Sequence, residues 1–235
     1  MLNNNLLALV LTVLIAIVWL RLNDFIAHRG WVSSVISRKI IHIGTGPIFV
    51  LCWLLFNETP SAPYLAALIP LAITIQFALV GAGVIKDPSA VTAMSRTGDR
   101  REILRGPLFY GIAFVVLTIV FWRRSPIGIV AMMMLCGGDG LADIVGKKVG
   151  GIKLPWSLKK SLAGSLTMLL GGFVFSVLVV WVFVWQNFFP HPMSQYLLPI
   201  AVIAVATTIT ESLPYSDVDN ITVPLVSSLL GLFIF

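Results

Sequence analysis

Charged residues are scarce in this sequence of 235 amino acids. Asp, Glu, Lys and Arg make up 11% of it, against about 25% in a soluble globular domain, and 58% of the residues are hydrophobic. This imbalance excludes a soluble fold. Because a membrane-spanning helix takes about 20 mostly apolar residues, the chain has room for about eight crossings. We therefore predict an all-α, polytopic integral membrane helical bundle that forms a single domain over residues 1–235.

Several familiar chemical signatures are also missing. Two cysteines, Cys52 and Cys136, provide no disulfide framework, and three scattered histidines do not suggest a zinc site. Lys160-Ser161 lacks the glycine and the spacing of a P-loop, and neither a Gly-x-Gly-x-x-Gly after a strand nor a serine-centred nucleophile elbow is present. The net charge of +6 records orientation in a membrane protein. We expect no nucleic-acid partner.

The amino terminus carries no targeting signal that we can identify. Residues 1–20 lack the basic start and the small-residue cleavage site of a secretory signal, and they lack the Arg- and Ser-rich character of a transit segment. From this we expect an uncleaved first span. We also expect an integral protein of a cyanobacterial or other bacterial membrane, either plasma or thylakoid.

Apolar runs separated by polar residues predict eight membrane spans. They are Leu6 to Leu22, Ile40 to Phe56, Tyr64 to Ile85, Leu108 to Trp122, Pro126 to Cys136, Leu162 to Trp185, Tyr196 to Thr210 and Ile221 to Phe235. With these spans, all of the 16 Lys and Arg residues except Arg123 and Arg124 fall on one side. Because Lys and Arg are retained on the cytoplasmic side, we expect both termini on the other side. The acidic residues other than Glu58 also fall on the basic side, so any active site should face the cytoplasm.

The stretch from Gly137 to Ser165 carries the strongest sign of chemistry. Asp139 and Asp143 are four residues apart, so on a helix they share a face and could both reach one Mg²⁺ ion. Glycines such as Gly138 and Gly140 would let backbone N–H groups approach phosphate oxygens, and five lysines follow. Together these features are typical of a metal–nucleotide site. Alternatively, the lysines anchor helix ends and the glycines allow tight helix packing.

A second cluster begins the second span. Arg38 and His42 are also four residues apart, so both could face the same phosphate or carboxylate. The alternative for Arg38 and Lys39 is topological anchoring, and for His42 a hydrogen bond to a neighbouring helix.

Two further polar stretches lie on the basic side. Four arginines between Arg96 and Arg105 could clamp phosphate or lie on anionic lipid headgroups. Glu211, Asp217 and Asp219 follow the seventh span with no basic residue among them. They could be metal ligands, partners of the surplus lysines, or ordinary loop acids.

Motifs along most of the chain from Arg38 onward occur together in a known pattern. The central ones are Gly137-Gly138-Asp139-Gly140-Leu141-Ala142-Asp143 with Gly146, Lys153-Leu154-Pro155, and Lys160-Ser161-x-Ala163-Gly164-Ser165. Supporting ones are Arg38-Lys39-x-x-His42-x-Gly44, Arg105-Gly106-Pro107-Leu108-Phe109-Tyr110, Ser125-Pro126-Ile127-Gly128, and Glu211-Ser212-Leu213-Pro214 with Asp217, Asp219-Asn220 and Val223-Pro224. This pattern resembles the membrane-bound polyprenol kinase family, which includes the dolichol kinases, and most closely its phytol kinases.

The resemblance implies an integral membrane kinase that transfers phosphate from CTP to the hydroxyl of an isoprenoid alcohol. Phytol is the implied acceptor, and its phosphate would feed salvage toward tocopherol, phylloquinone or chlorophyll. The stretch from Pro214 to Asn220 is a residue or two shorter than expected in plant phytol kinases, so it stays open which of Asp217 and Asp219 takes the family role.

We expect each group of residues to have a distinct role in phosphoryl transfer. Asp139 and Asp143 would hold Mg²⁺, His42 would close the site, and Glu211 or Asp217 would accept the proton of the alcohol. The predicted nucleotide-binding residues are Arg38, Lys39, Gly138, Gly140, Lys147, Lys148, Lys160 and Ser161. The acceptor's tail would stay in membrane lipid with its hydroxyl at the interface.

Two other classes of protein remain as alternatives. Phosphatidate cytidylyltransferases resemble the chain over the same Gly-Asp, Lys-Leu-x-Pro and Lys-Ser/Thr-x-x-Gly pattern, but their carboxy-terminal Pro-Gly-His-Gly-Gly signature is absent here. A small transporter could use the same charges as a substrate path, although such transporters usually show related halves, which we do not find. The identity of the isoprenoid alcohol and the oligomeric state stay open.

Overall fold

The computed structural model describes residues 1–95, 97–214 and 218–235. Its α-helices are α1 (Asn5–His28), α2 (Ser34–Cys52), α3 (Ala62–Ala82), α4 (Pro88–Met94), α5 (Gly106–Val120), α6 (Ile127–Met133), α7 (Gly140–Val149), α8 (Leu162–Trp185), α9 (Met193–Ser212) and α10 (Asp219–Ile234). Two 3₁₀ turns, η1 (Trp53–Leu55) and η2 (Arg100–Leu104), and a π-helical segment, η3 (Met134–Asp139), lie between them. A short antiparallel hairpin joins β1 (Lys153–Leu154) to β2 (Ser157–Ser161).

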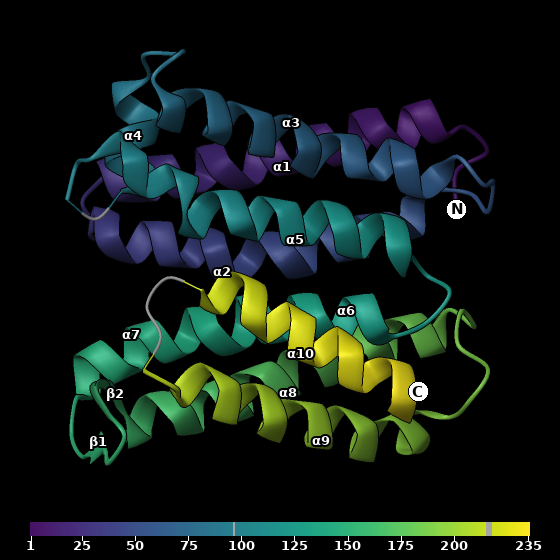
Figure 1. The fold of residues 1–235 in the computed structure, drawn as a ribbon. Coiled ribbons are helices and arrows are strands. Elements are labelled where there is room, and N and C mark those ends of the chain that lie inside the picture. The colour runs from purple at the N-terminus through teal and green to yellow at the C-terminus, as the bar shows by residue number, and fades with distance from the viewer. Residues whose placement is uncertain (96, 215–217) are drawn as a thin grey trace.

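Seven segments of the described chain are long and apolar enough to cross a membrane. They are Asn5–His28, Ile36–Leu55, Ala62–Ala82, Arg100–Val120, Ile127–Val149, Leu162–Trp185 and Met193–Ser212, and α10 is a shorter apolar helix. The prediction of a polytopic helical membrane bundle is therefore confirmed. Both chain ends lie at one end of the bundle and the hairpin lies at the other (Figure 1). We call the end with the hairpin the basic end; which side of a membrane it faces stays a prediction.

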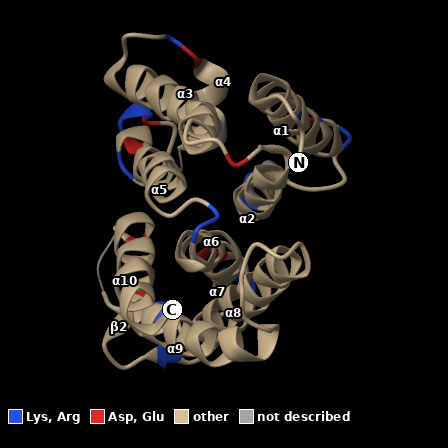
Figure 2. Ribbon diagram, turned by 90° about the vertical axis from the view of Figure 1, so that its right-hand side faces the viewer, with Lys and Arg blue, Asp and Glu red and all other residues tan. Residues whose placement is uncertain are grey.

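The fifth span is the central helix of the molecule. In the most apolar 18-residue stretch of this span, 78% is buried inside the molecule, whereas the corresponding share in the other six spans is 17–39%. Helices α1 to α5 lie on one side of α6, and α8 and α9 lie on the other (Figures 1 and 2). The core is consequently built around α6 and η3, where residues 127 to 138 are all buried.

The predicted boundary of this span was wrong. We expected it to end at Cys136, before the Gly-Asp motif, but α6, η3 and α7 run on without a break to Val149. The reason is that the glycines serve helix contact: a Cβ at Gly138 would lie 2.7 Å from the sulfur of Met168 in α8. Small residues let membrane helices approach closely. The motif therefore lies within a packed helix instead of a loop.

Arg123 joins the helices at the end opposite the hairpin. Its side chain is buried, and its guanidinium donates hydrogen bonds of 2.9 Å to the carbonyl oxygens of Trp53, Phe56 and Asn57. It also lies over the ring of Phe188, 4.6 Å from the centroid. The planar fork of arginine suits this set of acceptors, which a single ammonium could not satisfy in the same geometry.

We expect Arg123→Lys to destabilise the protein by roughly 2 kcal/mol, because a single ammonium nitrogen cannot reach all three carbonyl oxygens and at least one buried acceptor would lose its donor. Thermal unfolding in detergent would measure the change. Arg124→Lys is the matched control, since Arg124 is the neighbouring residue and is exposed. Equal melting temperatures for the two variants would contradict the structural role of Arg123.

Candidate active site

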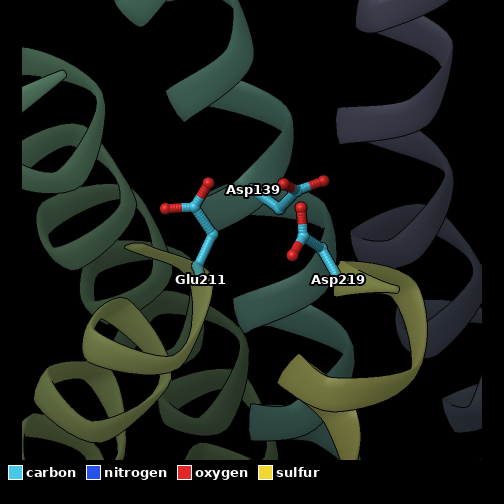
Figure 3. Close-up of side chains that lie close together, drawn as sticks. All are labelled: Asp139, Glu211 and Asp219. Carbon is cyan, nitrogen blue, oxygen red and sulfur yellow. The ribbon is translucent and has the colours of Figure 1, made fainter. Parts of the chain in front are cut away.

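Three carboxylates converge at the basic end of the bundle. Asp139 comes from the end of η3, Glu211 from the last turn of α9 and Asp219 from the first residue of α10 (Figure 3). One ligand atom from each side chain lies within 4.8 Å of the others. Glu211 is the most enclosed, with 5% of its side chain exposed. Residues that are 72 and 80 positions apart from Asp139 thus form a single acidic cluster, which we call the carboxylate cluster.

Lys160 reaches this carboxylate cluster from β2. Its Nζ contacts Glu211 Oε1 and lies 3.1 Å from Asp219 Oδ2. Burial alone would lower the pKa of the Lys160 ammonium, but the carboxylates of Glu211 and Asp219 outweigh burial and raise this pKa above its ordinary value. Lys160 therefore stays protonated throughout the neutral range.

The hairpin that carries Lys160 is fixed at both of its ends. Lys153 in β1 pairs with Ser161 in β2, and the Ser161 hydroxyl accepts a hydrogen bond of 3.2 Å from the backbone N–H of Gly164, which caps α8. At the tip, the indole N–H of Trp156 donates to the carbonyl oxygen of Ser212 over 3.1 Å. This places the hairpin beside the carboxyl end of α9 and directs Lys160 toward Glu211.

Asp143 has partners of its own. Its carboxylate lies 2.6 Å from Lys39 Nζ, in α2, and 2.8 Å from Lys147 Nζ, one turn along α7. Asp139 and Asp143 thus border the same pocket but belong to different groups: Asp139 to the carboxylate cluster, Asp143 to a pair of lysines. The structure therefore groups Asp139 with Glu211 and Asp219 and not with Asp143, and the binding of Mg²⁺ stays a prediction.

These groups line a pocket of about 440 Å³ at the basic end. Five lysines and four acids border it, and Gly146 and Gly164 bring α7 and α8 close together along one wall. The lining residues are Lys39, Gly106, Asp139, Ala142, Asp143, Gly146, Lys147, Gly150, Lys153, Lys159, Lys160, Ser161, Gly164, Ser165, Glu211, Asp219 and Asn220. The arrangement can hold a polyphosphate against its lysines and a cation against its acids.

His42 lies behind Asp139. Its Nε2 is 3.8 Å from Asp139 Oδ2, which is too far for a hydrogen bond, and it has no hydrogen-bond partner among the described residues. Its ring packs against Tyr110 in α5, with 4.5 Å between the centroids, and the Tyr110 hydroxyl donates to the His42 carbonyl oxygen over 3.1 Å. His42 is therefore held in place one layer outside the pocket, with a polar atom toward the carboxylate cluster.

Other residues suggested by the sequence lie away from the pocket lining. Arg38 donates to the carbonyl oxygen of Ser95 over 2.9 Å, and Lys148 is exposed and does not line the pocket. Gly138 and Gly140 are buried at contacts between helices, so the structure does not present their N–H groups to the pocket. Asp217 lies outside the described residues.

Several lining residues were not among the site residues predicted from the sequence, and Lys153, Lys159, Gly106 and Asn220 are four of them. Lys153 and Lys159 belong to the lysine-rich stretch, so that run was a usable signal for them. Gly106 and Asn220 are 114 residues apart, and the Asn220 amide donates to the Gly106 carbonyl oxygen over 2.8 Å. No local pattern indicates that contact, because it depends on α5 and α10 lying side by side.

Comparison with known proteins gives the family. No family model and no solved structure matches the chain. A protein of Triticum aestivum named as a probable chloroplastic phytol kinase is 40% identical over 214 residues, which are 90% of this chain and 71% of the relative. Phytol kinase 1, chloroplastic, of Arabidopsis thaliana is 35% identical over 214 residues, 90% of this chain and 70% of the relative. The chain belongs to the phytol kinase family.

The relatives of this chain are named for more than one alcohol. Farnesol kinase, chloroplastic, of Arabidopsis thaliana is 40% identical to the chain over 212 residues, which are 89% of this chain and 69% of the relative. The predictions that the chain belongs to this family and is a kinase are both confirmed.

The expectation of a bacterial membrane is contradicted. The phytol kinase and farnesol kinase relatives are chloroplastic proteins of plants. Our expectation rested on the first residues of the chain, and in the structure residues 5–28 form the first membrane helix. A hydrophobic helix of this length suits any bilayer and therefore identifies no compartment.

Proposed function

We propose that the protein transfers a phosphate from CTP to the hydroxyl of phytol or a related isoprenoid alcohol. The observation that carries this proposal is a pocket with five lysines and the carboxylate cluster at the ends of membrane helices. The names of the relatives, phytol kinase and farnesol kinase, supply the class of acceptor. CTP as the donor rests on the resemblance of the motif around Asp139 to polyprenol kinases.

The lysines of the pocket would bind the phosphates of the nucleotide. The pocket is lined by Lys147, Lys153 and Lys159. Lys39 also lines it, and its ion pair with Asp143 holds the Lys39 side chain in place. Phosphoryl transfer needs charge neutralisation and alignment more than covalent help from the protein. Several ammonium groups that line one cavity would provide both, because each can contact a different phosphate oxygen.

The carboxylate cluster fits Mg²⁺. Asp139, Glu211 and Asp219 offer only oxygen ligands, which this hard cation prefers, and the orphaned Nε2 of His42 is available to support Asp139 from behind. When bound, Mg²⁺ would neutralise charge on the phosphates during transfer. We propose these three carboxylates as the residues that hold it, in place of the pair Asp139 and Asp143.

Glu211 would also take the proton of the alcohol. Its carboxylate has two oxygens, so one can contact a cation while the other accepts a proton. The side chain is nearly buried, which keeps bulk water away from the transferring phosphate. The hydroxyl would reach it at the mouth of the pocket, while the apolar tail of the alcohol stays beside the exposed hydrophobic side chains of α5 and α10, such as Ile112 and Leu225.

Incubation of membranes containing the protein with labelled CTP and phytol tests this function. A kinase yields phytyl phosphate and CDP. A cytidylyltransferase would instead require phosphatidate and release pyrophosphate, and a transporter would yield neither product. Formation of pyrophosphate, or no phosphorylated product with phytol, farnesol or geranylgeraniol, would overturn the proposal. Running the three alcohols in parallel also ranks them as acceptors.

We expect Lys147→Met to raise the KM for CTP about three- to tenfold with a smaller change in kcat. The side chain lines the pocket but is 64% exposed, so solvent screens its contribution. Steady-state kinetics at varied CTP would measure it. Lys148→Met removes the same charge from the next residue, outside the pocket lining, and should change KM less than twofold. If both substitutions raised the KM for CTP equally, the lysines of α7 would act on the nucleotide only through the net charge of the helix and not through a contact of Lys147.

A further inference from the structure

Lys160 occupies a place among the carboxylates that a bound cation would need. Its Nζ contacts Glu211 and lies 3.1 Å from Asp219, and both acids belong to the carboxylate cluster with Asp139. A divalent cation held by Glu211 and Asp219 would lie within a few ångströms of this ammonium, and the two positive charges would repel each other strongly in a partly buried site. The ammonium and the metal ion are therefore competitors for the same oxygens.

The geometry of Lys160 gives the ammonium an alternative position. Its side chain is 22% exposed and lines the pocket beside Lys159 and Ser161, where the phosphates of a nucleotide would bind. The four-carbon stem of lysine is flexible, while the backbone of β2 is fixed by the hairpin and by the Ser161 cap of α8. A change of rotamer can therefore move the charge from carboxylate to phosphate without moving the hairpin.

We propose that Lys160 is a resident counter-ion that excludes divalent cations from the carboxylate cluster until a nucleotide is bound. With no nucleotide present, the ammonium pairs with Glu211 and Asp219 and offsets part of their charge; Glu211, with 5% of its side chain exposed, is the costlier of the two to bury without a cation. A triphosphate attracts the ammonium and so releases both acids for Mg²⁺. Binding of the nucleotide and of the metal is then coupled, and by linkage each strengthens the other. This inference rests on the proposed function, since it assumes that the carboxylate cluster binds a cation.

The opposite role for Lys160 makes a different prediction. If the lysine only braced β2 against α9 and α10, its removal would loosen the carboxylate cluster and weaken cation binding. If it competes with the cation, its removal strengthens cation binding in the absence of nucleotide. The sign of the change in cation affinity therefore separates the two roles, independently of catalytic activity.

The test uses Mn²⁺ as a spectroscopic probe of the purified protein in detergent, with no nucleotide and no alcohol present. Electron paramagnetic resonance of free Mn²⁺ measures the dissociation constant. We expect Lys160→Met to bind Mn²⁺ at least fivefold more tightly than the wild type. Lys159→Met is the matched control, because it removes the same charge from the neighbouring strand residue that also lines the pocket. It should change the affinity less than twofold.

Two further variants guard against a folding defect. Lys160→Gln keeps a hydrogen-bond donor and should tighten Mn²⁺ binding as Lys160→Met does, whereas Lys160→Arg keeps the charge and should resemble the wild type. Mn²⁺ binding that is unchanged or weaker in both uncharged variants overturns the role of Lys160 and leaves the metal site standing. The proposed metal site itself fails if the wild type, with CTP added, binds no more Mn²⁺ than the same concentration of CTP binds without protein.

Discussion

Replacing Asp139 with Asn is expected to lower kcat for alcohol phosphorylation by about 10³-fold, because charge neutralisation provides most of the catalysis in phosphoryl transfer. The substitution keeps the size of the side chain but removes one of the three charges of the carboxylate cluster. Formation of phytyl phosphate from labelled CTP, at several Mg²⁺ concentrations, would measure the loss. Part of it should be recovered at high Mg²⁺, since a weakened site fills when more cation is supplied.

Asp143→Asn is the control for this experiment. Asp143 lies on the same continuous helix and lines the same pocket, but it forms ion pairs with Lys39 and Lys147. We expect this substitution to raise the KM for CTP up to about tenfold through the displaced lysines, with no change in the Mg²⁺ requirement. If Asp143→Asn raised the Mg²⁺ requirement as much as Asp139→Asn does, the metal ligands would instead be Asp139 and Asp143, the pair first suggested by the sequence.

Much of the fold could be predicted from the sequence, because apolar runs of about 20 residues leave few choices in a membrane. The third, sixth, seventh and eighth predicted spans match α3, α8, α9 and α10 to within three residues at each end. The fifth does not, because glycine and aspartate usually mark the end of a helix. In this chain Gly137, Gly138 and Gly140 instead face Phe175, Met168 and Ile43, and that packing is visible only in three dimensions.

The candidate site could be predicted only in part. The acids and lysines between Asp139 and Ser161 are close together in the sequence, so their composition alone indicated a site in this region. The contacts of Lys160 are not local: they join β2 to residues 51 and 59 positions further along the chain. From sequence, Glu211 and Asp219 were candidates for metal binding or for lysine partners, and nothing in their spacing could decide between them. In the structure, the carboxylate oxygens of Glu211 and Asp219 contact Lys160 and also belong to the cluster that could hold a metal ion.

Replacing Glu211 with Gln is expected to lower kcat by roughly 10²- to 10³-fold, which is the usual effect of removing a positioned proton acceptor. An amide cannot accept the proton of the alcohol, and it also leaves Lys160 without one of its two carboxylate partners. The nucleotide is bound mainly by the other lysines of the pocket, so the KM for CTP should stay within about threefold of the wild type. The loss should therefore fall on kcat and not on binding.

Glu58→Gln is the matched control, because Glu58 is exposed in the loop before α3 and lies outside the pocket lining. This variant should retain wild-type kinetics, and both variants should be compared for thermal stability before their activities are read. A kcat for Glu211→Gln within a few-fold of the wild type would show that the proton leaves by another route. Because the transition state of phosphoryl transfer is loose, the hydroxyl then needs no strong base, and Glu211 would act on the cation alone.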